Sequence, residues 1–211
     1  MKHLIIASSA TALLIAGCAT DGGPSQRVLT GAGIGAVTGG ALGTLAGGDD
    51  GRNAAIGAAV GAIAGAAVGD YMDRQEERLR QQTAGTGIEV DRQGDQIYLT
   101  APSNVTFEVN SASIQPQFYG TLNDIARTLV DYPSTAVDVV GHASADGPAD
   151  YNMQLSQRRA VTVADYLNAQ GIDAVRLYAT GMGETQPLPG ISPEDPANRR
   201  VEIVLTPITQ G

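Results

Sequence analysis

The residues of this sequence best suited to binding a charged ligand lie in a polar stretch with helical spacing, NMQLSQRRA, residues 152–160. A helix over this stretch places Asn152, Ser156 and Arg159 on one face, because their spacing follows the helical repeat. The planar guanidinium of Arg159 can donate two parallel hydrogen bonds to a carboxylate. The alternative is that Arg159 is an exposed helix residue without a ligand, the role we expect for Arg158.

A second polar stretch, GHASADG at residues 141–147, follows an apolar run. Asp146 precedes Gly147, and Asp in that position is common in turns. His142 is the only histidine after His3. With no cysteine or second histidine near it, we expect no metal site, and we expect His142 to hold the loop by hydrogen bonds. No catalytic triad, Cys/His pair or carboxylate pair is evident, so we expect neither enzyme activity nor a cofactor.

The first residues, MKHLIIASSATALLIAGC, have the layout of a secretory signal peptide, with a positive charge, a short apolar run and small residues. Cys18 is the only cysteine of the chain, and the stretch IAGC that it ends resembles the lipobox of bacterial lipoproteins. We therefore expect residues 1–17 to be a lipoprotein signal peptide, Cys18 to carry lipid, and residues 18–30 to form a lipidated tether. The alternative is an ordinary cleaved signal that ends near a cysteine.

Lipidation would decide where the protein is held. Two acyl chains are enough for stable membrane anchoring. In such lipoproteins an Asp after the lipidated cysteine favours the inner membrane, so Ala19 indicates the outer membrane, with the C-terminal domain in the periplasm. The formal charge of −9 gives no bulk attraction to nucleic acid.

Glycine recurs at every fourth position between residues 31 and 69, on both sides of the charged turn DDGRN. This spacing forms a stripe without side chains along a helix, which lets two helix backbones approach closely. Glycine costs an isolated helix up to about 1 kcal/mol per residue relative to alanine, so close packing must compensate. We expect a glycine-zipper helical hairpin over residues 31–69, either embedded in a membrane or packed on itself or on other copies as a homo-oligomer.

The sequence becomes charged at residues 70–87, which we expect to be an exposed helix followed by a linker. From residue 88 to 207 the pattern predicts one α+β domain, with two main helices packed on a mixed β-sheet. The expected elements are a hairpin at 88–100, an extended stretch at 103–109, a helix at 115–131, a strand at 136–141, a helix at 149–169, and strands at 176–181 and 199–206.

Four separated motifs of this domain, NVTFEVNSASIQP, VVGHASADG, NMQLSQRRA and NRRVEI, stand in an order and at separations that closely resemble the OmpA-like C-terminal domain. The resemblance covers residues 88–207, and with the lipobox and the zipper it extends over nearly the whole chain. It implies non-covalent binding of peptidoglycan at the diaminopimelate of the stem peptide. Diaminopimelate carries an ammonium and a carboxylate on one carbon.

The family motifs assign a role to each half of that ligand. In the family an Asp two residues after the loop histidine binds the amine, and the Arg of LSxxRA binds the carboxylate. Arg159 matches the Arg, but the Asp position holds Ser144. A serine adds no charge, so we expect amine recognition to be weaker by roughly 1–3 kcal/mol. Asp146 supplies the missing carboxylate if the loop shifts its register.

Other matched residues are assigned less specific roles by the resemblance. Asn152 shares the helix face of Arg159. Asn110 and Ser111 lie in the family's pocket-side loop, where polar contact and a turn are equally suitable roles. The segment NRR, residues 198–200, is interpreted as mainly structural, with Asn198 near the site.

Two functions follow from these observations. The first is an outer-membrane-anchored lipoprotein that binds peptidoglycan and links the membrane to the cell wall. The second is an oligomerising envelope protein whose OmpA-like domain has weakened or lost wall binding through the replacement of Asp by Ser144.

Overall fold

The computed structural model describes residues 63, 67–108 and 110–209. The predicted signal peptide, Cys18, the tether of residues 18–30 and nearly all of the zipper of residues 31–69 lie outside these residues. Among the described helices, none combines the length and the apolar character that a membrane crossing needs.

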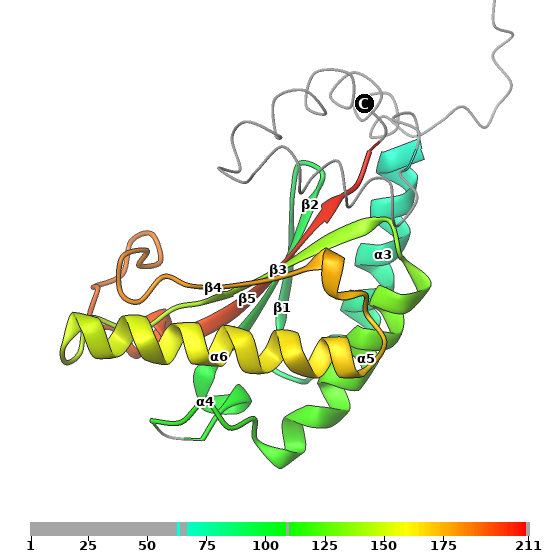
Figure 1. The fold of residues 1–211 in the computed structure, drawn as a ribbon. Helices are drawn as coiled ribbons and strands as arrows, with labels where there is room; N and C mark the ends of the chain where they lie inside the picture. Colours follow the sequence, from blue (N-terminus) through cyan, green and yellow to red (C-terminus); the bar gives the residue numbers. More distant parts are fainter. Residues whose placement is uncertain (1–62, 64–66, 109, 210–211) are drawn as a thin grey trace, which may run out of the picture.

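A five-stranded sheet in the order β1-β2-β5-β3-β4 forms the centre of the fold (Figure 1). Only β3 and β4 run parallel, and the other neighbours are antiparallel. The predicted α+β domain with a mixed sheet is confirmed. The strands are β1 (Glu89–Gln93), β2 (Gln96–Pro102), β3 (Thr135–Gly141), β4 (Leu177–Gly181) and β5 (Arg200–Pro207).

Alternating side chains along the central strands bury one face of the sheet. On β2 the buried residues alternate with half-buried ones, and β3 repeats this pattern. The register places Leu99 beside Ile203, and Ile203 beside Val139, so three strands contribute one continuous apolar row. Such alternation is typical of a sheet with one face covered by helices.

Two of the covering helices match the predicted segments. Helix α5 (Tyr119–Asp131), preceded by the short η2 turn (Pro116–Phe118), and helix α6 (Ala149–Ala169) bury the expected apolar residues. Val130 is the exception, since 47% of it is exposed. It faces Gly171, which has no side chain to cover it.

The sequence predicted an extended stretch at residues 103–109, but the first four of these residues are helical. Residues Ser103–Thr106 form one turn of helix, α4, immediately after β2. The Thr106 hydroxyl donates to the Pro102 carbonyl at 2.9 Å, and the Phe107 N–H donates to the Ser103 carbonyl at 2.9 Å. Local hydrogen bonds of this kind compete with extended structure and close the chain into a turn.

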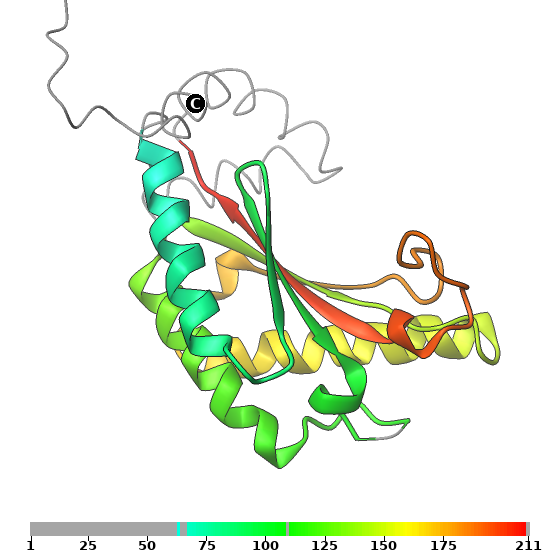
Figure 2. The same cartoon turned by 180° about the vertical axis from the view of Figure 1, so that it is seen from behind.

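The charged segment of residues 70–87, predicted as an exposed helix followed by a linker, does contain a helix, but one side of that helix is buried. It forms α3 (Val68–Thr83), and Met72 and Leu79 on its inner side are fully buried in the core. Arg92 of β1 pairs with Asp73 and Glu76, so α3 lies over the same sheet face as the other helices (Figure 2). Most of the other charged residues of α3 lie on its exposed side.

The chain enters this packed unit beside its own C-terminal end. The Ile63 N–H donates to the Ile208 carbonyl at 2.9 Å, and Ile63 forms a parallel bridge with Thr209. The Ile208 N–H in turn donates to the Ser134 carbonyl, just before β3 begins. The end of the glycine-rich segment is therefore hydrogen-bonded to the extension of β5.

Candidate functional site

Where the first half of α6 crosses the ends of β3 and β4, Ser144, Asp146 and Asn152 contact one another, whereas Arg159 contacts residues of the 103–111 segment. Two glycines make this crossing possible. A Cβ on Gly141 would lie 2.2 Å from the Ser156 carbonyl oxygen, and one on Gly181 would lie 2.3 Å from the Gln157 nitrogen. Any larger residue would push α6 away from the strand ends, so both glycines fix the helix that carries the site.

Arg159 is only 5% exposed, which excludes the alternative of a solvated helix residue. Its Nε donates to the Ser111 carbonyl at 2.8 Å and its Nη1 to the Ser103 hydroxyl at 3.2 Å. The guanidinium also lies over the Phe107 ring, 4.9 Å from its centre. These contacts hold the side chain in one orientation.

No carboxylate balances this charge within the part of the chain that the structure describes, because Arg159 takes part in none of its ion pairs. Burial lowers the pKa of the Arg159 guanidinium, and the nearby Arg199 and Arg158 lower it further, against an opposing effect of Tyr151. A buried cation without a partner is costly. The site therefore has an electrostatic need for an anion.

Ser144 and Asp146 lie together on the loop that faces α6. The Ser144 hydroxyl is buried and donates to the Asp146 carboxylate at 3.2 Å. Arg199 Nη1 contacts both residues, at 3.2 Å from Ser144 Oγ and 3.3 Å from Asp146 Oδ2. The structure thus brings a carboxylate within hydrogen-bond reach of the Ser144 side chain, and that carboxylate remains half exposed.

Asn152 holds this loop in place. Its buried amide nitrogen donates to the carbonyls of Ser144 and Asp146, at 3.1 and 3.3 Å, and to Glu184 Oε2 at 2.7 Å. All its donor capacity is directed at protein atoms. In this geometry Asn152 positions the loop and Glu184, and its amide nitrogen has no free hydrogen for a ligand.

Glu184 is the site residue that the sequence did not indicate. It lies in the loop after β4, next to the turn at Gly183, and is half buried. Nothing in the surrounding GMGETQ distinguishes this glutamate from any surface carboxylate. Only the position of Asn152, 32 residues away in the chain, brings it to the site.

Asn110 and Ser111 have different roles in the structure. Asn110 is exposed and adopts a left-handed backbone with φ of 52°, which Asn tolerates better than most residues. Its neighbour Ser111 supplies the carbonyl that accepts from Arg159. The structure therefore brings Ser111 to the guanidinium and gives Asn110 the turn that presents it.

His142 lies beneath the loop and not on its surface, with 1% exposed. Its backbone N–H donates to the Arg200 carbonyl, but neither ring nitrogen has a hydrogen-bond partner among the described residues. The hydrogen bond that His142 makes therefore comes from its backbone and not from its ring. The side chain that holds this loop is Asn152, as described above. Asn198 holds the neighbouring segment 188–193, because its fully buried amide donates to the carbonyls of Ser192 and Pro193 and accepts from the Leu188 N–H.

Below the site, Glu202 is paired with Arg200, whose Nε donates to Glu202 Oε1 at 2.7 Å. Burial alone would raise the pKa of this carboxyl, but His142 and Arg200 lower it more, to about 2. The His142 Nε2 lies 3.6 Å from Glu202 Oε2, beyond hydrogen-bond length, so Arg200 is the closer and stronger partner.

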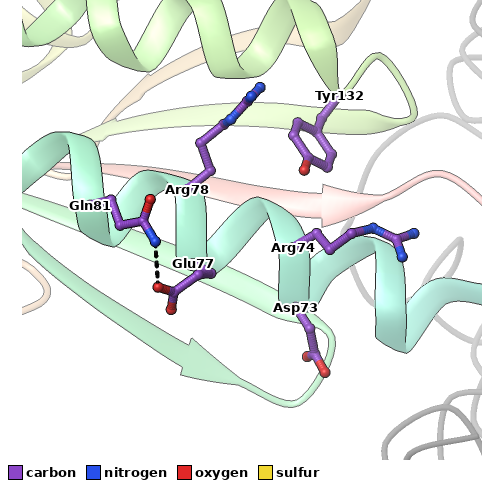
Figure 3. A pocket seen from close by; sticks show the side chains of 6 residues that line it. All are labelled: Asp73, Arg74, Glu77, Arg78, Gln81 and Tyr132. Atoms are coloured by element: carbon purple, nitrogen blue, oxygen red, sulfur yellow. Dashed lines mark hydrogen bonds between the residues drawn. The ribbon is translucent and has the colours of Figure 1, made fainter.

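A separate hollow of about 410 Å³ lies along α3, and no predicted site residue borders it (Figure 3). The charged side chains of this hollow come from α3, and Gln81 donates to Glu77, one turn earlier on the same helix, at 2.7 Å. Arg78 is already paired with Asp131. The candidate site therefore remains at the other end of the sheet, with a buried cation, Arg159, and two accessible acids, Asp146 and Glu184.

Comparisons with known proteins agree with this description of the molecule. The OmpA family profile matches residues 106–200, and the YMGG-like Gly-zipper profile matches residues 1–73. The chain is 43% identical over 214 residues to the "Probable lipoprotein YiaD" of Escherichia coli (strain K12), covering 98% of each chain.

Solved structures with the same fold include two that cover nearly all of their own chains. A MotB-like protein from Desulfovibrio vulgaris superposes with a TM-score of 0.57 at 25% identity, over 65% of this chain and 95% of the other. The cell wall anchor of the T6SS from Pseudomonas aeruginosa gives a TM-score of 0.55 at 32% identity, over 63% and 99%. The described domain is thus similar to modules from several kinds of envelope protein.

Proposed function

Because this chain belongs to the OmpA family and shares its layout with a lipoprotein over almost its whole length, we propose that it binds peptidoglycan without a covalent bond and links the outer membrane to the cell wall. The cell wall anchor of Pseudomonas aeruginosa, 32% identical, supports this proposal by its fold and by its name. In the proposed arrangement Cys18 carries the lipid anchor, and the described domain faces the periplasm.

The observation that carries the proposal is the buried, unbalanced guanidinium of Arg159. A carboxylate of the ligand would supply the missing negative charge through a planar, charge-assisted contact. Arg159 Nη2 donates no hydrogen bond within the described residues, while Nε and Nη1 are already held. The preformed orientation reduces the entropy that binding must remove.

The ammonium of diaminopimelate would donate hydrogen bonds to the Asp146 carboxylate, on the same side of the loop as Ser144. The carboxylate of Asp146 lies 3.2 Å from the Ser144 hydroxyl, so it occupies the neighbourhood in which the family has an Asp two positions earlier. Glu184, held by Asn152, adds a second negative charge nearby. The site then carries both signs of charge for a zwitterionic ligand.

Sedimentation of the mature chain, solubilised in detergent, with isolated peptidoglycan tests the proposal. We expect Arg159→Ala to reduce the bound fraction by about tenfold or more, since a charge-assisted contact is worth roughly 1.5–3 kcal/mol. Arg159→Lys, which keeps the charge but loses the planar fork, should retain partial binding.

Arg158→Ala is the matched control, because this neighbouring arginine is exposed and should leave binding unchanged. Circular dichroism melting of each variant separates lost binding from lost structure. If the folded wild-type protein is not retained by peptidoglycan, the second function applies, that of an oligomerising envelope protein without wall binding.

A further inference from the structure

A second hollow is bordered by α4, by η2 and the start of α5, and by the turn that follows α3. It has a volume of about 370 Å³, within the range typical of small-ligand sites. Its polar lining consists only of hydroxyl and amide side chains, and Val105 and Phe118 form an apolar wall. The polar residues are Thr86, Asn104, Gln115, Gln117 and Thr121.

The lining indicates the chemistry of the ligand. No residue of this hollow is charged, so nothing in it favours a charged group. Amides and hydroxyls both donate and accept hydrogen bonds, which suits sugar hydroxyls and an acetamido group. An apolar wall beside them suits the C–H face of a sugar ring or an acetyl methyl group.

The hollow is held in shape by its own hydrogen bonds. Gln115 Nε2 donates to the carbonyls of Asn104 and Phe107, at 2.9 and 2.5 Å, and its side-chain oxygen accepts from Gln117. The Thr86 hydroxyl donates to the Thr83 carbonyl at 2.7 Å. The outer amides of Asn104 and Gln117 are exposed and can contact a ligand.

The same segment connects this hollow to the proposed diaminopimelate site. Asn104 directly follows Ser103, whose hydroxyl accepts from Arg159, and Phe107 lies under the guanidinium. In peptidoglycan a short stem peptide joins diaminopimelate, its third residue, to an N-acetylated sugar. Three extended residues span about 10 Å, and the two sites use neighbouring residues of the same short segment, Ser103 and Asn104.

We propose that this hollow binds an N-acetylated amino sugar of the peptidoglycan strand whose stem peptide occupies the Arg159 site. This proposal rests on the proposed function. It adds a second contact, to the glycan, at a place where the chain carries no charge.

Isothermal titration of the mature chain with two ligands tests it: a diaminopimelate-containing stem tripeptide, and the same tripeptide on its disaccharide. We expect the wild-type protein to bind the disaccharide form about fivefold or more tighter, as one or two added hydrogen bonds would give. Asn104→Ala and Gln117→Ala should each reduce that gain and leave tripeptide affinity unchanged. Gln170→Ala, at an exposed glutamine at the end of α6, is the control.

The outcomes separate the two proposals. Equal affinity for both ligands, or a gain that survives both substitutions, overturns the sugar site and leaves the Arg159 site intact. A wild-type protein that binds neither form rejects the proposed function itself.

Discussion

At the scale of single residues, the candidate site differs from the family motif in the position of one acidic residue. Ser144 stands where the family has Asp, and Asp146 places its carboxylate against the Ser144 hydroxyl. Arg199 contacts both side chains and partly balances the charge of Asp146. In the proposed site we therefore expect amine binding to depend on Asp146, and we expect Ser144→Asp to have different effects with and without the Asp146 carboxylate.

We expect Asp146→Ala to weaken binding of the stem tripeptide by roughly tenfold, because a charge-assisted contact is lost. Adding Ser144→Asp to this variant should restore binding, since the new carboxylate occupies the family position. Titration calorimetry of the single and double variants measures both effects. Asp150→Ala, at an exposed acid one turn away, should bind like the wild type. A double variant no better than Asp146→Ala would contradict this assignment.

The Glu202 carboxyl makes the free energy of unfolding depend on pH in the acidic range. Its pKa falls from an ordinary 4.5 to about 2 in the folded protein, so its stabilising effect is complete above about pH 5 and is lost as the pH falls toward 2. The shift corresponds to roughly 3 kcal/mol at most. We expect urea unfolding between pH 5 and pH 2 to show a smaller loss of unfolding free energy in Glu202→Gln than in the wild type.

Glu89→Gln serves as the control for that series, because Glu89 is an exposed carboxylate on the edge strand β1. It should follow the wild-type curve. Parallel slopes for Glu202→Gln and the wild type would show that the Arg200 pair does not determine the acid sensitivity.

Sequence motifs could indicate candidate side chains for the site, but not their contacts in the fold. Arg159 and Ser144 were identified by their match to motifs, and the structure places them at the same end of the sheet. The exposure of Arg159 was left open because burial depends on Ser103 and Ser111, which are about 50 residues away. Glu184 could not be predicted for the same reason, since its partner is distant in the chain.

At the scale of elements, periodicity predicted every described strand and helices α5 and α6, because each buries one continuous stripe. It was insufficient for α3, where only a few apolar residues interrupt a charged run. Their burial is decided by distant partners: Gln75 donates to Thr135 and Tyr71 accepts from the Ser134 N–H. For α4 the local hydrogen bonds of Thr106 and Phe107 were decisive, and these have no periodic pattern.

The contact between α6 and the strand ends gives a prediction at this scale. We expect Gly181→Ala to lower the free energy of unfolding by more than about 2 kcal/mol, because its Cβ would overlap backbone atoms of α6 that cannot move independently. Gly120→Ala in α5 is the matched substitution, with open space around its Cβ, and should raise stability by roughly 0.5–1 kcal/mol. Thermal and urea unfolding measure both. If both substitutions change the free energy of unfolding by the same amount, or if Gly181→Ala does not lower it, then α6 is free to shift.

At the scale of the whole molecule, the entry of the chain and the candidate site lie at opposite ends of the sheet. Ile63 is hydrogen-bonded beyond the last residue of β5, close to Ser134 and the start of β3. The site residues gather where β3 ends at Gly141 and where β5 begins at Arg200. Strand β3 has seven residues, so about 20 Å separate the two ends.

Under the proposed function, in which the protein links two layers of the envelope, the position of β5 has a mechanical consequence. Tension between membrane and wall would enter at Ile63 and leave near Arg200, so that it would run along β5. This strand is flanked on both sides, by β2 and by β3, with antiparallel hydrogen bonds perpendicular to its axis. Pulling along the strand would load all of these bonds together in shear, so they would have to break together. Peeling the strands apart, in contrast, would break the bonds one after another.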